Sequence, residues 1–318
     1  MAGDEAEQDP GRQFAVGLDI VDFSSGVAPL GIKQAVSEIN AAERAGFDRA
    51  WVPVLGGGPD PLVVCAAAAA HTRVIGLATG VMRTWAHHPV ELARAAVSVA
   101  AVCGGGLTLG VGVSHRPLVE STYGLSWSRP AAHLREYLSV LATLLRRGEV
   151  DYHGEIWSAH AELDMTGAQP VRLAAAAGGP RMLAAAAAVA DVVVTNMAGP
   201  WTLATHTVPA LRRAERSDGV TPTLAVAVTV CVTDRPEVAA GFIDSTLAGY
   251  AENPDYRAML DREGVRRPSD IAVVGDEDEV RRGLDQLIDA GVDEIIVSIK
   301  APSDEEENRT RAFVAAKQ

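Results

Sequence analysis

The sequence predicts an α/β fold of the (β/α)8 or TIM-barrel class, with insertions after the fourth and seventh strands. The chain has 318 residues, of which 48% are hydrophobic, so it can form one large core of the size such barrels need, typically about 250 residues. Eight short apolar segments alternate with helical segments, which is the pattern of repeated βα units. The short segments lack a period of two, as expected of parallel strands covered by helices on both faces.

The predicted strands are short apolar runs bounded by polar or turn-forming residues. In chain order they span residues 14–20, 49–54, 74–79, 107–113, 171–176, 192–195, 223–232 and 294–299. Eight such runs over about 300 residues favour a closed barrel over an open Rossmann sheet.

Each predicted strand is followed by sequence with helical spacing. The helices are expected at residues 31–45, 60–71, 89–103, 131–147, 181–190, 202–216, 277–290 and 305–316. Gly46 is a suitable C-terminal stop for the first, and Pro89 suits a first helical turn because its missing N–H is not needed there. The insertion after the fourth strand is expected to hold a loop and an extended piece at 153–157, and the insertion after the seventh, residues 235–275, includes helical stretches.

We expect residues 1–12 to be a flexible acidic tail and residues 13–318 to form one barrel domain. The chain start lacks the apolar region of a signal peptide, and no apolar run reaches the roughly 18 residues of a membrane span. These features predict a soluble, cytoplasmic protein. The three cysteines, Cys65, Cys103 and Cys231, lie in apolar contexts without metal-ligand spacing, so we interpret them as buried free thiols.

The formal charge of −13 disfavours nucleic acid and anionic membranes as partners, because both must be neutralised by basic residues. Any anionic ligand has to be held by a local arrangement, since the overall field repels it.

The active site of a TIM barrel lies at the C-terminal ends of its strands, and few side chains there suit known barrel chemistries. Asp19 follows the first strand and is either a functional acid or a loop cap. His115 follows the fourth and either exchanges a proton near neutral pH or is an ordinary polar residue. Adjacent histidines and a single strand-end lysine, Lys300, argue against a metal centre and against a Schiff-base aldolase.

Residues Gly178, Gly179, Pro180 and Arg181 follow Ala177 at the end of the fifth strand. Two glycines let a backbone approach an anion, the helix start presents free N–H groups, and Arg181 adds a cation. This segment is either a phosphate cradle or an ordinary strand-to-helix turn, and its spacing does not decide between them.

Glycines 110 and 112 interrupt the fourth strand, which indicates either a cofactor ring close to the backbone or a tight packing contact. Thr79, Gly80 and Val81 form a further strand end with unusual backbone freedom. Side chains near other strand ends are expected to line a substrate pocket: Trp85, His87, Asn196 and Trp201.

Four segments in register resemble the luciferase-like monooxygenase superfamily of bacterial barrels. They are residues 72–81 with 88–90, 104–115, 177–184 with 190–191, and 273–297, and the resemblance extends over about residues 13–300. Within that superfamily, residues 112–117, 123–124 and 135–137 resemble the actinobacterial oxidoreductases that use the deazaflavin coenzyme F420.

The resemblance implies a cofactor ring across the strand ends, over a non-prolyl cis peptide near Gly80 and Val81, with the cofactor phosphate at residues 177–181. It also implies that Thr79 and Ser114 hydrogen-bond the cofactor, while Asp19 and His115 face the reacting centre. Two departures matter: Gly106 stands where many members have arginine, and residues 54–55 stand where many have an acidic residue or histidine. The second departure leaves the general acid unidentified.

The implied function is hydride transfer between F420 and a C=C, C=N or C=O bond of a small organic substrate. Two alternatives stay open: an FMN-dependent monooxygenase of the same fold, supplied by a flavin reductase and oxygen, and a non-catalytic barrel that binds a flavin-like ligand. The resemblance also implies a possible homodimer formed through helices near the second and third strands. Substrate identity and the direction of hydride transfer do not follow from the sequence.

Overall fold

The computed structural model describes residues 14–21, 29–214, 216 and 219–316. The predicted acidic tail, 1–12, lies outside the described residues. Within the described part of the chain, no helix is both long and apolar enough to cross a membrane.

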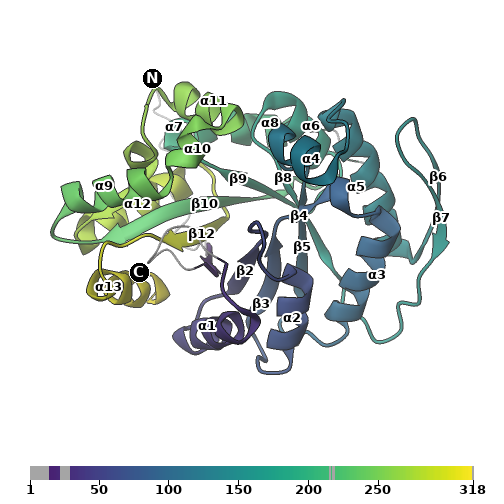
Figure 1. The fold of residues 1–318 in the computed structure, drawn as a ribbon, viewed down its shortest axis with the longest axis horizontal. Coiled ribbons are helices and arrows are strands. Elements are labelled where there is room, and N and C mark those ends of the chain that lie inside the picture. The colour runs from purple at the N-terminus through teal and green to yellow at the C-terminus, as the bar shows by residue number, and fades with distance from the viewer. Residues whose placement is uncertain (1–13, 22–28, 215, 217–218, 317–318) are drawn as a thin grey trace, which may run out of the picture.

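Eight parallel strands close into a barrel, which confirms the predicted fold (Figure 1). In chain order they are β1 (Ala15–Asp19), β2 (Arg49–Pro53), β3 (Gly76–Gly80), β5 (Leu107–Gly112), β8 (Arg172–Ala176), β9 (Val192–Asn196), β10 (Thr223–Val232) and β12 (Glu294–Ile299). Each pairs with its neighbour in this order, and the pairing of β1 with β12 closes the circle. The observed bounds lie within two residues of the predicted ones, because buried apolar runs mark strands clearly.

An outer layer of helices covers the barrel (Figure 1). It consists of α1 (Ile32–Ala45), α2 (Pro61–Ala69), α3 (Pro89–Ala100), α5 (Pro130–Arg147), α6 (Pro180–Ala187), α8 (Val208–Arg212), α12 (Glu277–Asp289) and α13 (Asp304–Ala315). Local signals explain their ends: Gly46 adopts a left-handed φ of 89° after α1, and the Asp60 side chain accepts the N–H groups of Leu62 and Val63 at the start of α2.

The predicted helix 202–216 is not one regular α-helix. The structure has α7 (Pro200–Thr202), a π-helical stretch (Leu203–Thr207) and then α8. Pro209 lies in the first turn of α8 and has no N–H to continue an α-helical ladder, which accounts for the irregular step before it.

Alternate strand residues point into the barrel, and those near the N-terminal ends of the strands fill its floor. Glu294 is 2% exposed and accepts hydrogen bonds from Trp51 Nε1 at 2.8 Å and from Arg49 Nε at 3.0 Å. Gly17 leaves space for the indole, since a Cβ there would lie 2.7 Å from Trp51 Cδ1. We call Arg49, Trp51 and Glu294 the barrel floor, and the C-terminal strand ends the barrel mouth.

The insertion after β5 differs from the sequence prediction in two ways. Residues expected to form a loop contain helix α4 (Arg116–Tyr123), and the expected extended piece at 153–157 is the turn of an antiparallel hairpin, β6 (Glu149–His153) with β7 (Ser158–Glu162). The Glu136 carboxylate on α5 holds this turn by accepting the backbone N–H groups of residues 155–157. Both elements are short and polar, so their apolar pattern is weak.

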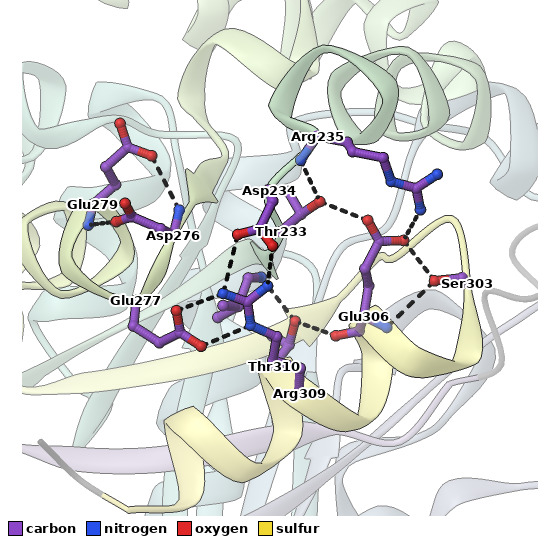
Figure 2. A network of polar contacts seen from close by, with 11 residues as sticks. Thr233, Asp234, Arg235, Asp276, Glu277, Glu279, Ser303, Glu306, Arg309 and Thr310 are labelled. Carbon is purple, nitrogen blue, oxygen red and sulfur yellow. Dashed lines mark hydrogen bonds and ion pairs between the residues drawn. The ribbon is translucent and has the colours of Figure 1, made fainter.

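The insertion after β10 contains α9 (Pro236–Thr246), α10 (Ala248–Glu252), α11 (Pro254–Glu263), a 3-10 turn (Pro268–Ile271) and β11 (Val273–Gly275), which pairs with β10. Figure 2 shows how the end of β10 is fastened to α13. Glu306 accepts hydrogen bonds from Thr233 at 2.6 Å, Ser303 at 2.6 Å and Arg235 at 2.9 Å. Arg309 binds Glu277 and Asp234 at the surface of the same network.

Candidate active site

Four polar side chains share the inner face of the barrel at its mouth. Strand alternation places Asp19 on β1, Asn196 on β9, and Ser298 with Lys300 at the end of β12 on the side opposite the outer helices. The inner positions below them, such as Ala78 and Ile296, belong to a small apolar cluster inside the barrel. Polar groups therefore begin where the apolar barrel interior ends.

Lys300, Ser298 and Asp19 form a hydrogen-bonded chain. Lys300 Nζ donates to Ser298 Oγ at 2.7 Å, and Ser298 Oγ donates to Asp19 Oδ2 at 3.0 Å. Lys300 is 3% exposed, whereas Asp19 is only partly buried. Burial lowers the pKa of Lys300 to about 8, with the Asp19 charge opposing this shift, and burial raises the pKa of Asp19, with Lys300 and Ser298 opposing it.

Two tyrosines from the insertion after β10 face this chain. Tyr250 on α10 and Tyr256 on α11 stack with ring centroids 5.0 Å apart, and burial raises the pKa of both phenols. The Asp19 charge adds to the shift of Tyr250, while a side-chain hydrogen bond with Asn196 opposes that of Tyr256. The insertion therefore supplies aromatic side chains to the barrel mouth.

His115 joins this cluster from the other side. Its ring lies edge-on to Tyr256 at 5.1 Å, and its Nδ1 lies 3.1 Å from Asp255 Oδ2 on α11. The hydrogen bond from His115 lowers the pKa of Asp255. The candidate catalytic residue His115 thus contacts the tyrosine pair and Asp255, and the charge of Asp19 acts on Tyr250.

The end of β3 carries the cis peptide that the resemblance implies, between Gly80 and Val81. Beside it, Thr79 Oγ1 donates to the Gly110 carbonyl at 2.8 Å and accepts the Gly110 N–H at 2.9 Å. A Cβ at Gly110 would overlap the Thr79 carbonyl, and one at Gly112 would lie 2.8 Å from Val81 Cγ2. Of the two explanations for these glycines, the structure shows the packing contact. The Thr79 hydroxyl is buried and already bound to β5.

Two strand ends at the mouth have left-handed backbone at residues other than glycine. Ser114 after β5 has a φ of 64°, and Met197 after β9 has a φ of 56°. Such conformations cost free energy and concentrate at functional sites. Ser114 directly precedes His115, so its backbone sets the direction in which the imidazole leaves the strand end.

The segment after β8 has the form expected of an anion site. Helix α6 begins at Pro180, its N-cap Gly179 has an extended backbone, and no side chain caps it. A Cβ on Gly179 would meet nothing within 4 Å, and Arg181 is exposed in the first turn. Ala177 is held to β9 by its N–H bond to the Val194 carbonyl. The uncapped amides and Arg181 fit an anionic group.

The structure separates the four predicted pocket residues. Asn196 lies at the mouth beside Tyr256. Trp85 stacks on His133 of α5 with centroids 3.7 Å apart, in an aromatic cluster of the buried His133 and Tyr137 with the partly buried Trp85, Trp127 and Trp157. His87 contacts the Arg83 carbonyl through Nδ1 at 2.9 Å, and Trp201 is 57% exposed on α7.

Sequence reasoning did not assign a role to Ser298, Lys300 or Asp255. Strand alternation along β12 could have placed Ser298 and Lys300 on the inner face, but Asp255 comes from a helix without a clear apolar period. Among the described residues, no cluster of three or more His, Cys, Asp or Glu side chains is arranged to hold a metal ion.

Comparison with known proteins places this architecture among its relatives. A family model described as luciferase-like monooxygenase matches residues 18–294. A Mycobacterium tuberculosis protein, named as a proposed coenzyme F420-dependent oxidoreductase, is 27% identical over 322 residues, covering 82% of this chain and 89% of its own.

Solved structures share the fold. The coenzyme F420-dependent tetrahydromethanopterin reductase of Methanopyrus kandleri superposes with a TM-score of 0.78 at 20% identity, covering 95% of this chain and 97% of the other. The oxygenating constituent of 3,6-diketocamphane monooxygenase from Pseudomonas putida, solved with FMN, has a TM-score of 0.72 at 18% identity, covering 95% and 97%. At these identities the similarity establishes the barrel architecture.

Proposed function

Since the chain belongs to the luciferase-like monooxygenase family, we propose that it is an oxidoreductase that uses coenzyme F420 to transfer a hydride to or from a small organic substrate. The observation that carries this proposal is the uncapped, glycine-flanked start of α6 beside the barrel mouth. The relative named for F420, aligned over 82% of this chain, supports F420 over FMN.

Different residues at the mouth would bind the anionic part and the ring of such a cofactor. The amides at the start of α6 and Arg181 would hold its anionic part, with Gly178 and Gly179 allowing close approach. The ring would lie toward Gly80, Val81 and Ser114. When bound, the deazaflavin supplies hydride chemistry, because carbon replaces the reactive ring nitrogen and reaction with oxygen is poor.

The protein's own contribution is to orient the substrate and to exchange a proton with it. Asp19 and His115 are the candidates for proton exchange, since both have hydrogen-bonding groups at the mouth. Tyr250, Tyr256 and Asn196 would form part of the substrate pocket wall, which suits a partly apolar molecule containing a C=C, C=N or C=O bond.

We also propose that the protein forms a homodimer through α2 and its neighbours. Helix α2 is apolar on all sides, and Val63 on its outer face is 53% exposed. Val74 and Val102, at the ends of neighbouring segments, are 76% and 58% exposed. A helix that is apolar all round is normally covered.

The cofactor assignment can be tested by titrating the purified protein with F420 and, in parallel, with FMN, and measuring the binding by calorimetry. We expect F420 to bind more tightly than FMN. Replacing Arg181 with alanine should weaken F420 binding about tenfold, because one charge-assisted contact is lost.

Arg94→Ala is the matched control, because Arg94 is exposed on α3 and pairs only with its helical neighbour Glu91 among the described contacts. Its F420 affinity should equal that of the wild type. Micromolar FMN binding without F420 binding would contradict the proposal and favour the monooxygenase alternative. If F420 binds but no labelled hydride is exchanged between it and a substrate, the result would favour the alternative of a non-catalytic, flavin-binding barrel.

A further inference from the structure

We propose that Lys300, acting through Ser298, holds Asp19 as a carboxylate at the barrel mouth and exchanges a proton with it during the reaction. Lys300 is then a positioning residue, and Asp19 is the group that meets the substrate. The inference rests on the proposed function for its reaction, but the coupling of the three residues is a property of the protein alone.

The geometry gives the chain a direction. The buried end is Lys300, 3% exposed, and the end nearest solvent is the partly exposed Asp19. The ammonium N–H donates to Ser298, whose own hydroxyl proton is donated to Asp19, with distances of 2.7 Å and 3.0 Å. A hydroxyl between a cation and a carboxylate, donating toward the carboxylate, is arranged to pass a proton in that direction.

The scaffold fixes all three residues. Ser298 and Lys300 are two residues apart on β12, so strand alternation gives them the same face. β12 pairs with β1 on one side and β10 on the other, and the Lys300 N–H bonds to the Val230 carbonyl at 3.3 Å. Sites built on central strands hold their geometry more closely than sites on loops.

Electrostatic interactions link the titratable groups of Asp19, Lys300 and Tyr250. Asp19 on β1 and Lys300 on β12 shift each other, and Tyr250 on α10 is the other described titratable group that the Asp19 charge influences. Tyr250 stays neutral at physiological pH because burial raises its pKa. The Lys300 and Asp19 charges therefore each oppose the effect of burial on the other, and removing either one takes that opposition away.

The proton balance is simple. Reduction of a polar double bond adds a hydride to one atom and a proton to its neighbour, and a bound deazaflavin would supply the hydride. Ser298 passes its proton to Asp19 and takes one from Lys300, so an N–H bond breaks and an O–H bond forms at Asp19. Asp19 then gives that proton to the substrate. The site is left with a neutral amine and a carboxylate, and one proton from solvent restores it; oxidation runs the same steps in reverse.

The protein can be tested directly without cofactor or substrate, because its sequence contains only three lysines: Lys33, Lys300 and Lys317. Protein labelled with ¹³C at lysine Cε gives three resonances, assigned with Lys33→Met and Lys300→Met. We expect one resonance to titrate near pH 8, as burial of Lys300 requires, and to be absent in Lys300→Met. Asp19→Asn should move this titration to still lower pH, because the nearby negative charge is gone.

The holoenzyme supplies the second readout. Lys300→Met should lower kcat by about 100-fold or more, the usual scale of lost acid–base assistance. The kcat of the wild type should change with pH near pH 8, where Lys300 titrates. Lys300→Arg keeps the cation but cannot release a proton near pH 8, so its kcat should not change there, and its KM should stay close to that of the wild type. Lys33→Met, an exposed lysine on α1, should leave kcat and KM unchanged.

Titration of all three lysines near their ordinary pKa, or no shift in Asp19→Asn, would overturn the inference whatever the enzyme's activity. A wild-type pH profile in Lys300→Arg would also overturn it, because the exchanged proton would then come from elsewhere. If the shifted lysine titrates as expected but F420 does not bind, the proposed cofactor fails and the coupled chain stands.

Discussion

At the scale of single residues, the barrel buries a histidine whose charge it does not tolerate. His133 is 1% exposed, stacks on Trp85 and places Nε2 2.9 Å from Thr84 Oγ1. Burial lowers its pKa to about 4, with Glu136 opposing the shift. Its folded pKa is below the unfolded value of 6.5, so the unfolded state binds the extra proton between these limits.

His133 should therefore make stability fall on acidification. The stabilising contribution of neutral His133 should be fully present above pH 6.5. As the pH decreases to 4, the free energy of unfolding should fall by about 3 kcal/mol. Urea unfolding at several pH values, compared between wild type and His133→Gln, isolates this contribution. The variant should show a shallower slope than His153→Gln, whose side chain is 81% exposed. Equal slopes in the two variants would exclude His133 as the cause.

At the scale of elements, the contacts of α13 show which polar groups hold a helix in place. Glu306 is 7% exposed and faces the end of β10, and Thr310 Oγ1 accepts the Val232 N–H at 2.8 Å (Figure 2). Burial opposes the ionisation of Glu306, but hydrogen bonds from Ser303, Thr233 and Arg235 lower its pKa overall. Arg309, on the same helix, makes its ion pairs at the surface.

Replacing Glu306 with alanine should cost about 2–3 kcal/mol of unfolding free energy, because it leaves partly buried donors unpaired. Arg309→Ala is the matched control on the next turn of the helix, and it should cost less than about 1 kcal/mol, as surface ion pairs do. Chemical denaturation measures both, and hydrogen exchange should show faster exchange of α13 in Glu306→Ala. A larger loss in Arg309→Ala would contradict this assignment.

The sequence predicts the elements well where one physical signal dominates. Every barrel strand was expected, because its residues are apolar on both faces. The hairpin β6–β7 was misplaced, since its residues alternate weakly and its turn depends on Glu136, a distant residue on α5. Helix α4 was missed because it is short and largely exposed; only Val119 is buried among its residues.

At the scale of the whole molecule, the site was predicted in part. Asp19, His115 and Asn196 were expected at the strand ends and lie at the barrel mouth, because a barrel gathers its strand ends there. Their partners could not be identified in the same way, since His115 meets Asp255 across 140 residues of sequence. Thr79 was expected to bind the cofactor. In the structure its hydroxyl bonds to the backbone of Gly110, just beyond the residues at which β3 pairs with β5.

The proposed dimer is also a property of the whole molecule. Replacing Val63 with glutamate places a charge on the apolar outer face of α2 and should convert a dimer to a monomer, as measured by sedimentation velocity at matched concentrations. Val238→Glu is the control, because Val238 is 51% exposed on α9, which lies well apart from α2 in Figure 1. A monomeric wild type, or a dimer that persists in Val63→Glu, would contradict the interface.

The barrel floor has a consequence for the order of events in catalysis. With Arg49, Trp51 and Glu294 closing the far end of the barrel, two reactants that meet inside the mouth must use the same opening. The molecule that sits deeper therefore enters first and departs last. For a cofactor that would be held at α6 deeper than the substrate, this means an ordered exchange in which the cofactor would bind before the substrate and, changed in redox state, leave after the product.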